Sequence, residues 1–133
     1  MPSQIELQES FQVGEASVFE CPAPSTDNMV VFEDDGESGY FYAVDGSGEE
    51  VKILDAILVY EVGNISGHKM PRKLEIVWAA DGQKACLVIN NVPHVIFDFE
   101  ARRAYSRSGF PPPNAGGFAN ERVWDDAALG LFR

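Results

Sequence analysis

A cluster of carboxylates in the first third of the chain is the clearest candidate for chemistry. Glu33, Asp34, Asp35 and Glu37 stand between residues 30 and 44, and no cation lies among them. Carboxylate oxygens bind hard cations such as Ca²⁺, but the acids that start at Asp34 lack the spacing of an EF-hand loop. Asp-Gly pairs are also ordinary turn chemistry. The sequence therefore predicts an acidic turn, with no metal and no cofactor.

A second candidate is the pair His94 and Asp98, which lie four residues apart on one face of a predicted strand. Such a pair can act as a general base and the group that orients it. However, no Ser or Cys stands in a nucleophile elbow, and no His-x-x-x-His or Cys-x-x-Cys pattern exists. A hydrogen-bonded structural histidine is the simpler interpretation. The sequence thus assigns no catalytic residue, and an enzyme remains only an alternative.

Two tyrosines follow the acidic turn directly. Tyr40 and Tyr42 alternate with Phe41 in a predicted strand, and neighbouring strand residues point to opposite faces. Either the tyrosines or Phe41 must therefore point outward. An outward tyrosine pair beside an acidic turn would form a binding surface. The alternative is a second buried face beneath a C-terminal helix.

Most of the chain is predicted to form antiparallel strands. A hairpin spans residues 30–44, and a meander of three strands, joined by Asp81-Gly82 and Asn90-Asn91 turns, follows later. Its strands are residues 74–78, 85–89 and 92–99. Residues 51–62 are ambiguous between a helix and a strand, and we predict a strand over residues 57–62.

The end of the chain has the spacing of a helix. Asn120 is a suitable N-cap, and one apolar face would contain Val123, Trp124, Ala127, Ala128 and Leu131. We therefore predict a mainly β protein, a single domain over residues 1–133. Its antiparallel sheet, or partly open barrel or roll, would be covered by one C-terminal α-helix.

Charge is distributed unevenly and limits the partners. The net charge is -11; residues 1–66 hold 1 cation and 14 acids, whereas residues 67–133 hold 9 cations and 7 acids. A field of this sign repels nucleic-acid phosphates and favours a basic protein partner. We therefore expect no nucleic acid as a partner.

The same sequence predicts a cytoplasmic location. No apolar run approaches the ~20 residues that a membrane helix needs. The first residues lack both the basic flank and the apolar stretch of a secretory signal. Cys21 and Cys86, the two cysteines, lie far apart and are predicted to be reduced thiols. We expect no membrane contact, and the sequence leaves the oligomeric state open.

Three segments, with the turn between the last two, carry a resemblance to a known family. The segment from Phe32 to Ala43, and the segments Leu74–Trp78 and Val92–Phe99 around Asp81-Gly82, resemble a small bacterial family, domain of unknown function 2251. The resemblance covers roughly residues 28–107. It implies a single-domain soluble bacterial protein, and it implies no activity.

Three functions remain open at this point. The first is an acidic protein-binding module, immunity-like or adaptor-like, that presents the acidic turn with Tyr40 or Tyr42 to a basic protein. The second is a hydrolase-type enzyme with a cleft at His94 and Asp98. The third is a small-ligand binder in a β-barrel lined by Trp78, Phe97 and Phe99. The sequence favours the first.

Overall fold

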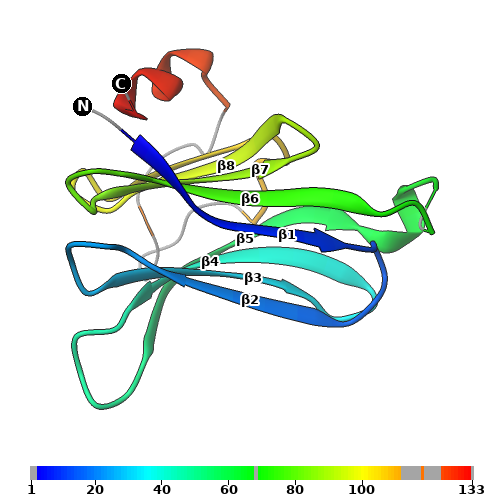
Figure 1. Cartoon of the computed structure of the whole chain (residues 1–133), viewed down its shortest axis with the longest axis horizontal. Helices are drawn as coiled ribbons and strands as arrows, with labels where there is room; N and C mark the ends of the chain where they lie inside the picture. The colour runs from blue at the N-terminus through cyan, green and yellow to red at the C-terminus, as the bar shows by residue number, and fades with distance from the viewer. Residues whose placement is uncertain (1–2, 68, 112–117, 119–123, 133) are drawn as a thin grey trace.

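A computed structural model describes residues 3–67, 69–111, 118 and 124–132. Within these residues, nine strands form two antiparallel sheets (Figure 1). The five-stranded sheet has the order β1-β6-β7-β8-β9, with β1 (Ser3–Phe11), β6 (Arg72–Ala79), β7 (Lys84–Ile89), β8 (Val92–Asp98) and β9 (Arg103–Ser106). The four-stranded sheet has the order β2-β3-β4-β5, with β2 (Ser17–Pro22), β3 (Asn28–Asp34), β4 (Ser38–Asp45) and β5 (Lys52–Glu61).

The two sheets lie face to face as the layers of a sandwich (Figure 1). The chain changes sheet between β1 and β2, because β1 pairs with β6 whereas β2 pairs with β3. Within the described residues, each sheet therefore has its own two edge strands, β1 and β9 in one sheet and β2 and β5 in the other. The mainly β, antiparallel prediction is confirmed, and the partly open barrel or roll is corrected to two separate packed sheets.

The predicted turns lie where the sequence placed them. Asn90 and Asn91 have φ angles of 49° and 66° and join β7 to β8, while Gly82, with φ 70°, lies between β6 and β7. Asn and Gly tolerate this left-handed region, which the two-residue hairpin at Asn90-Asn91 requires. The meander of β6, β7 and β8 is therefore confirmed.

The ambiguous segment is a strand that starts earlier than predicted. β5 pairs with β4 from Lys52 to Glu61, with irregularities in register at Gly39/Tyr40 and Ala43/Val44. These irregularities interrupt the simple alternation of side chains, so the apolar residues fall at a spacing that also suits a helix. Pairing with β4 satisfies the hydrogen-bonding groups of the β5 backbone, so this segment forms a strand and not a helix.

Aromatic side chains fill the space between the sheets. Phe41 stacks on Phe97 across the sandwich, with ring centroids 5.3 Å apart, and Trp78 stacks on Phe99 at 5.7 Å. Phe41, Phe97 and Trp78 are almost completely buried. These rings occupy the interior that a ligand-filled barrel would need to keep open.

The C-terminal helix differs in type from the prediction. The described segment η2 (Asp126–Phe132) is a 3-10 helix, and the predicted N-cap Asn120 and Val123 lie outside the described residues. Gly130 weakens an α-helix here. Ala128 N donates to the Asp125 carbonyl at 2.9 Å, a three-residue spacing. A shorter 3-10 helix, η1 (Val62–Asn64), follows β5.

η2 covers the outer face of the five-stranded sheet, above β6 and β8 in Figure 1. Ala128 packs with Cys86 and Ile96 of that face. This confirms the expected role of the segment as a cover. Among the described residues, we find no helical segment whose length and apolar character would let it cross a bilayer.

Candidate functional site

The outer face of the four-stranded sheet has a groove of about 350 Å³. Its floor consists of Met29 and Val31 of β3 with Tyr42 and Val44 of β4. We call this surface, with its margins described below, the open face. Strand alternation explains the floor, because Phe32 points into the core and its neighbour Val31 must point away.

The margins of the groove are partly apolar and partly acidic. Val18 and Glu20 of β2 and Glu33 of β3 line it towards one edge of the sheet, and Val51 and Ile53 line it towards β5. Val18 is 57% exposed, and Val51 and Ile53 are each 61% exposed. Aliphatic side chains gathered on one exposed face are typical of an interaction surface.

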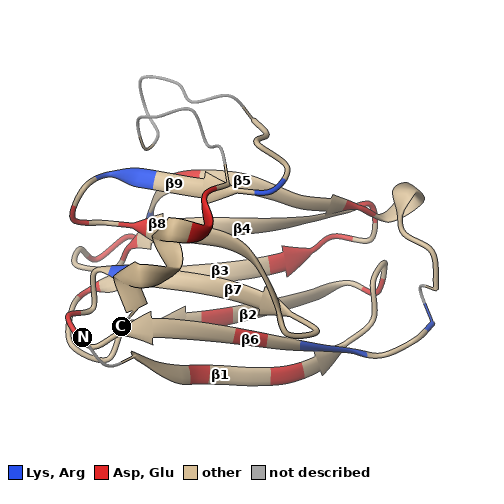
Figure 2. Cartoon of the chain, turned by 90° about the horizontal axis from the view of Figure 1, so that it is seen from above, with Lys and Arg blue, Asp and Glu red and all other residues tan. Residues whose placement is uncertain are grey.

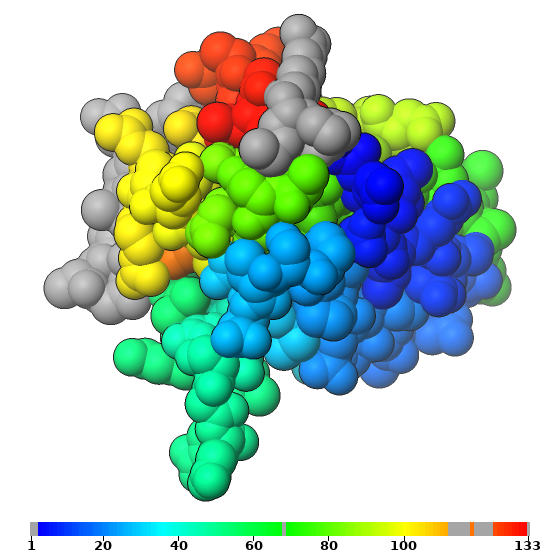
Figure 3. Space-filling model, turned by 60° about the vertical axis from the view of Figure 1, so that its left-hand side comes forward, coloured from blue at the N-terminus to red at the C-terminus, as the bar shows by residue number. Residues whose placement is uncertain are grey.

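An arm formed by the β4–β5 connection borders the groove. Figure 1 shows this connection extending from the four-stranded sheet, away from the five-stranded sheet, and Figure 3 shows it as a protrusion from the body. We define the arm as residues 46–53. It carries Val51 and Ile53, together with the exposed acids Glu49 and Glu50. The arm therefore gives an otherwise flat sheet a side wall.

The tyrosine question is resolved in favour of the surface. Phe41 is fully buried, so Tyr40 and Tyr42 point to the outer face, where their rings lie 6.1 Å apart at an angle of 22°. Both tyrosines are half-buried. An aromatic pair that is partly shielded by its own sheet loses little conformational entropy when a partner covers it.

A hydrogen bond joins this pair to the acidic turn. The Tyr42 hydroxyl donates to Glu33 Oε1 at 3.1 Å. Desolvation of the phenol, and then this bond to Glu33, raise the pKa of Tyr42 to about 12. Tyr42 therefore stays a neutral donor near neutral pH and holds the Glu33 carboxylate over the sheet.

The four acids of the turn have different positions. Asp35 and Glu37 are exposed, and Glu33 is half-buried on the open face. The backbone amides of Ser38 and Glu37 donate to Asp35 Oδ1, both at 2.9 Å, and lower the pKa of Asp35. Three acids thus remain at the surface, and acids also mark β1, β2 and the end of β3 in Figure 2.

Asp34 instead points inward and anchors the hairpin. It is 1% exposed, and its carboxylate accepts bonds from Gly14 N at 2.7 Å, Gly36 N at 2.8 Å and the Tyr60 hydroxyl at 2.6 Å. Burial of the Tyr60 phenol, followed by its bond to Asp34, raises the pKa of Tyr60. Asp34 is therefore a structural group that ties β3, β5 and the β1–β2 turn together, and a partner at the surface would not contact it.

His94 and Asp98 share a face of β8 but do not meet. Four residues of strand place their Cα atoms roughly 13 Å apart, with the buried Ile96 between them. Asp98 Oδ1 accepts a bond from Ala101 N at 3.0 Å and so holds the following turn. Burial, and then the charge of Arg107, lower the pKa of His94. In the described part of the chain, no hydrogen bond joins the two side chains.

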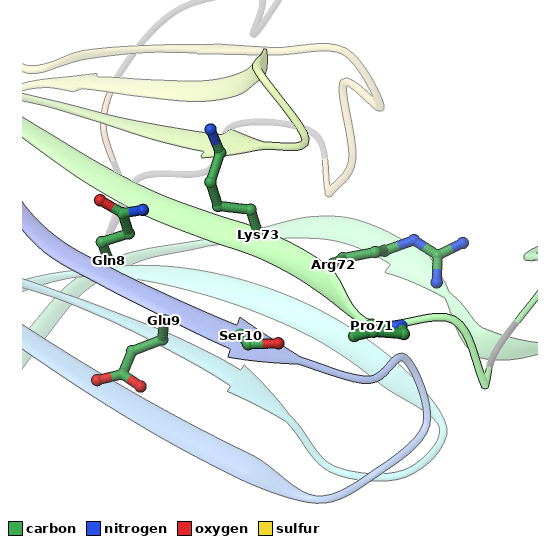
Figure 4. A pocket seen from close by; sticks show the side chains of 6 residues that line it. All are labelled: Gln8, Glu9, Ser10, Pro71, Arg72 and Lys73. Atoms are coloured by element: carbon green, nitrogen blue, oxygen red, sulfur yellow. The ribbon is translucent and has the colours of Figure 1, made fainter.

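A second hollow, of about 600 Å³, lies on β1 and the start of β6 (Figure 4). Its side chains diverge: Gln8 and Lys73 point to one side, and Glu9 points to the other. Arg72 is engaged with backbone carbonyls, donating to Ser66 at 3.0 Å and to Gly67 at 3.1 Å. This hollow offers no converging groups. Across the described residues, no group of three or more His, Cys, Asp or Glu side chains is arranged to hold a metal ion.

Sequence reasoning missed the apolar part of the open face. Val18, Met29, Val31 and Ile53 were not among the candidate residues, although a signal existed. Residues 29–32 are apolar on both sides of a strand, whereas an antiparallel strand with one solvated face normally alternates with polar residues. Such a strand is either covered on both faces or leaves apolar side chains on an outer face.

The fold and this surface define a class: an acidic, antiparallel β-sandwich protein with a groove on the outer face of its four-stranded sheet. The chain belongs to the bacterial family described as "Uncharacterized protein conserved in bacteria (DUF2251)", whose model matches residues 11–133. This confirms the family resemblance and extends it beyond residues 28–107.

A relative from Haemophilus influenzae (strain ATCC 51907 / DSM 11121 / KW20 / Rd), named "Uncharacterized protein", is 46% identical over 85 residues. The match covers 64% of this chain and 53% of that protein, so the chain aligns with about half the length of this relative. No solved structure matches the chain.

Proposed function

We propose that this protein is an acidic protein-binding module, adaptor-like or immunity-like, that binds a basic partner protein through the open face. One observation carries the proposal: exposed aliphatic side chains border a sheet face that bears two half-buried tyrosines and neighbouring carboxylates. Val51 and Ile53 remain 61% exposed beside the Tyr40–Tyr42 pair and Glu33.

The composition of the surface suits protein recognition. Tyrosines and a desolvated apolar centre supply most of the binding free energy in protein interfaces, while a charged rim excludes water and selects partners. Here Val31 and Tyr42 lie on the inner strands β3 and β4, Glu20 lies on the edge strand β2, and Glu33 accepts the hydrogen bond of Tyr42. The net charge of -11 adds long-range attraction for a basic protein and raises its association rate.

We also propose that residues 1–133 form one domain, that the protein is cytoplasmic and that it binds no nucleic acid. The same charge supports the last of these, because a chain with 21 acids and 10 cations is repelled by phosphates.

The test uses the tagged protein to capture binding partners from the lysate of a bacterium that carries a member of this family. It compares two matched substitutions. Val18→Lys changes an edge strand of the open face, and Ile5→Lys changes the edge strand β1 of the other sheet. The two side chains have nearly equal exposure, 57% and 55%, so both variants should fold, which circular dichroism checks.

We expect Ile5→Lys to bind the captured protein as the wild type does. Val18→Lys should weaken the affinity about tenfold or more, equivalent to about 1.4 kcal/mol of binding free energy. Equal capture by wild type, Ile5→Lys and Val18→Lys would refute the proposal.

A further inference from the structure

The groove of the open face has a shape and a charge pattern that specify its occupant. We infer that it accepts an amphipathic α-helix of the partner, with an apolar stripe on the groove floor and Lys or Arg along both flanks. This inference rests on the proposed function and narrows the partner to one kind of segment.

The sheet face that bears the groove is wide enough for a helix. Its lining extends from Val18 on β2, across β3 and β4, to Ile53 on β5. Four adjacent strands span three spacings of 4.8 Å, or roughly 14 Å. A helix with its side chains is about 10–12 Å across. An added strand would instead pair along one sheet edge and would leave most of this floor uncovered.

Charge around the groove favours a cationic occupant. Glu20 of β2 and Glu33 of β3 line the groove, and Glu49 and Glu50 are exposed on the neighbouring arm. Among the described lining residues there is no Lys or Arg. The arm has one cation, Lys52, whose charge acts on Asp45: hydrogen bonds from Ser47, and then Lys52, lower the pKa of Asp45. A second copy of this chain would bring acids against acids, which disfavours a symmetric dimer through this face.

The molecule itself contains a similar arrangement on its other sheet. There the helical segment η2 places Ala128 against Cys86 and Ile96, and the Arg107 guanidinium lies 4.3 Å from the Trp124 ring centroid. The other sheet of this sandwich therefore already packs against a helical segment and has a cation over an aromatic ring. On the open face, the tyrosine pair would receive the cation from the partner.

The test uses three synthetic 18-residue peptides. The first contains Leu and Lys at helical spacing; the second has the same composition with Leu and Lys strictly alternating, which suits a strand; the third has Leu and Glu at helical spacing. Binding is measured by fluorescence anisotropy at low and high salt, and the site is mapped by amide chemical-shift changes in the labelled protein.

We expect the helical Leu/Lys peptide to bind at least tenfold more tightly than either control, to weaken in high salt, and to shift amides of the open face. Ile53→Lys should weaken its binding at least tenfold, and Ile5→Lys should leave it unchanged. Equal affinity for the alternating peptide, equal weakening by Ile5→Lys, or a wild-type dimer that Val18→Lys dissociates would each overturn the inference.

Failure here is distinguishable from failure of the proposed function. If Val18→Lys loses the captured partner but the peptides show no helical preference, protein binding stands and the helical occupant is wrong. If capture does not depend on Val18, the proposed function fails regardless of the peptide result.

Discussion

The two sheets have outer faces that contain similar residues but differ in what lies on them. On the five-stranded sheet, Cys86 and Ile96 are buried beneath Ala128 of the C-terminal segment. On the four-stranded sheet, Val51 and Ile53 remain 61% exposed. Apolar surface that the chain covers with its own residues contributes to stability, because it leaves water on folding. Apolar surface that stays exposed contributes little until a partner covers it, so the difference separates a structural face from a candidate binding face.

The largest effect is expected when an isoleucine on each face is replaced by alanine. Ile96→Ala should reduce the free energy of unfolding by about 3 kcal/mol, because Ile96 is fully buried and truncation leaves a cavity. Ile53→Ala should change it by no more than about 0.5 kcal/mol, since the side chain is mostly in water. Urea denaturation measures both. Equal losses would mean that the open face is as structural as the covered one.

A second test removes the cover from the first face. Burial raises the pKa of the Cys86 thiol to about 12 and that of Cys21 to about 11. Deleting residues 124–133 should expose Cys86 and increase its rate of alkylation by iodoacetamide at least about tenfold, since reactivity follows access and thiolate fraction. Cys21, which lies between the sheets, should remain protected.

Peptide mass spectrometry resolves the two thiols of the deletion variant. Cys21 is the internal control, because global unfolding would expose both cysteines together. A protected Cys86 in a folded deletion variant would contradict the covering role of the segment.

The smallest expected effect concerns pH on the open face. The pKa of Tyr42, raised to about 12 from the usual value near 10, means that folding favours the protonated phenol. Its contribution to stability is therefore complete below pH 10 and is lost as the pH rises from 10 to 12. Tyr42→Phe should show a shallower fall in the free energy of unfolding across this interval than the wild type. Tyr40→Phe, which retains the Tyr42–Glu33 bond, is the control and should follow the wild type.

Local rules predicted the strands and turns but missed the start of β5 and the type of the C-terminal helix. The Asn90-Asn91 turn follows from tolerance of left-handed backbone, which is a property of the residues themselves. β5 was predicted only in part, because bulges in its pairing with β4 disturb the period-two pattern. The type of the C-terminal helix was wrong because the apolar spacing alone was considered, whereas Gly130 weakens an α-helix over Asp126–Phe132.

The candidate site was predicted in part. Tyr40, Tyr42 and Glu33 do lie together on one surface, as the strand pattern allowed. Asp34 lies on the opposite side, although alternation with Val30 and Phe32 already placed it on the buried face. His94 and Asp98 share a face, but the rise of a strand keeps them apart. The apolar lining on β2 and on the arm joins this surface only through pairing across four strands.

The sequence by itself determined the mainly antiparallel β class, the acidic first half and the family, because alternation, turn chemistry, charge and motif are local or summed properties. Only the tertiary structure decided that β1 crosses to the second sheet and that Asp34 bonds to Gly14 and Tyr60. It also decided that, among the described residues, Cys86 and Ile96 are covered whereas Val51 and Ile53 stay exposed. These outcomes depend on contacts between residues far apart in the chain, and such contacts form only when the two sheets pack.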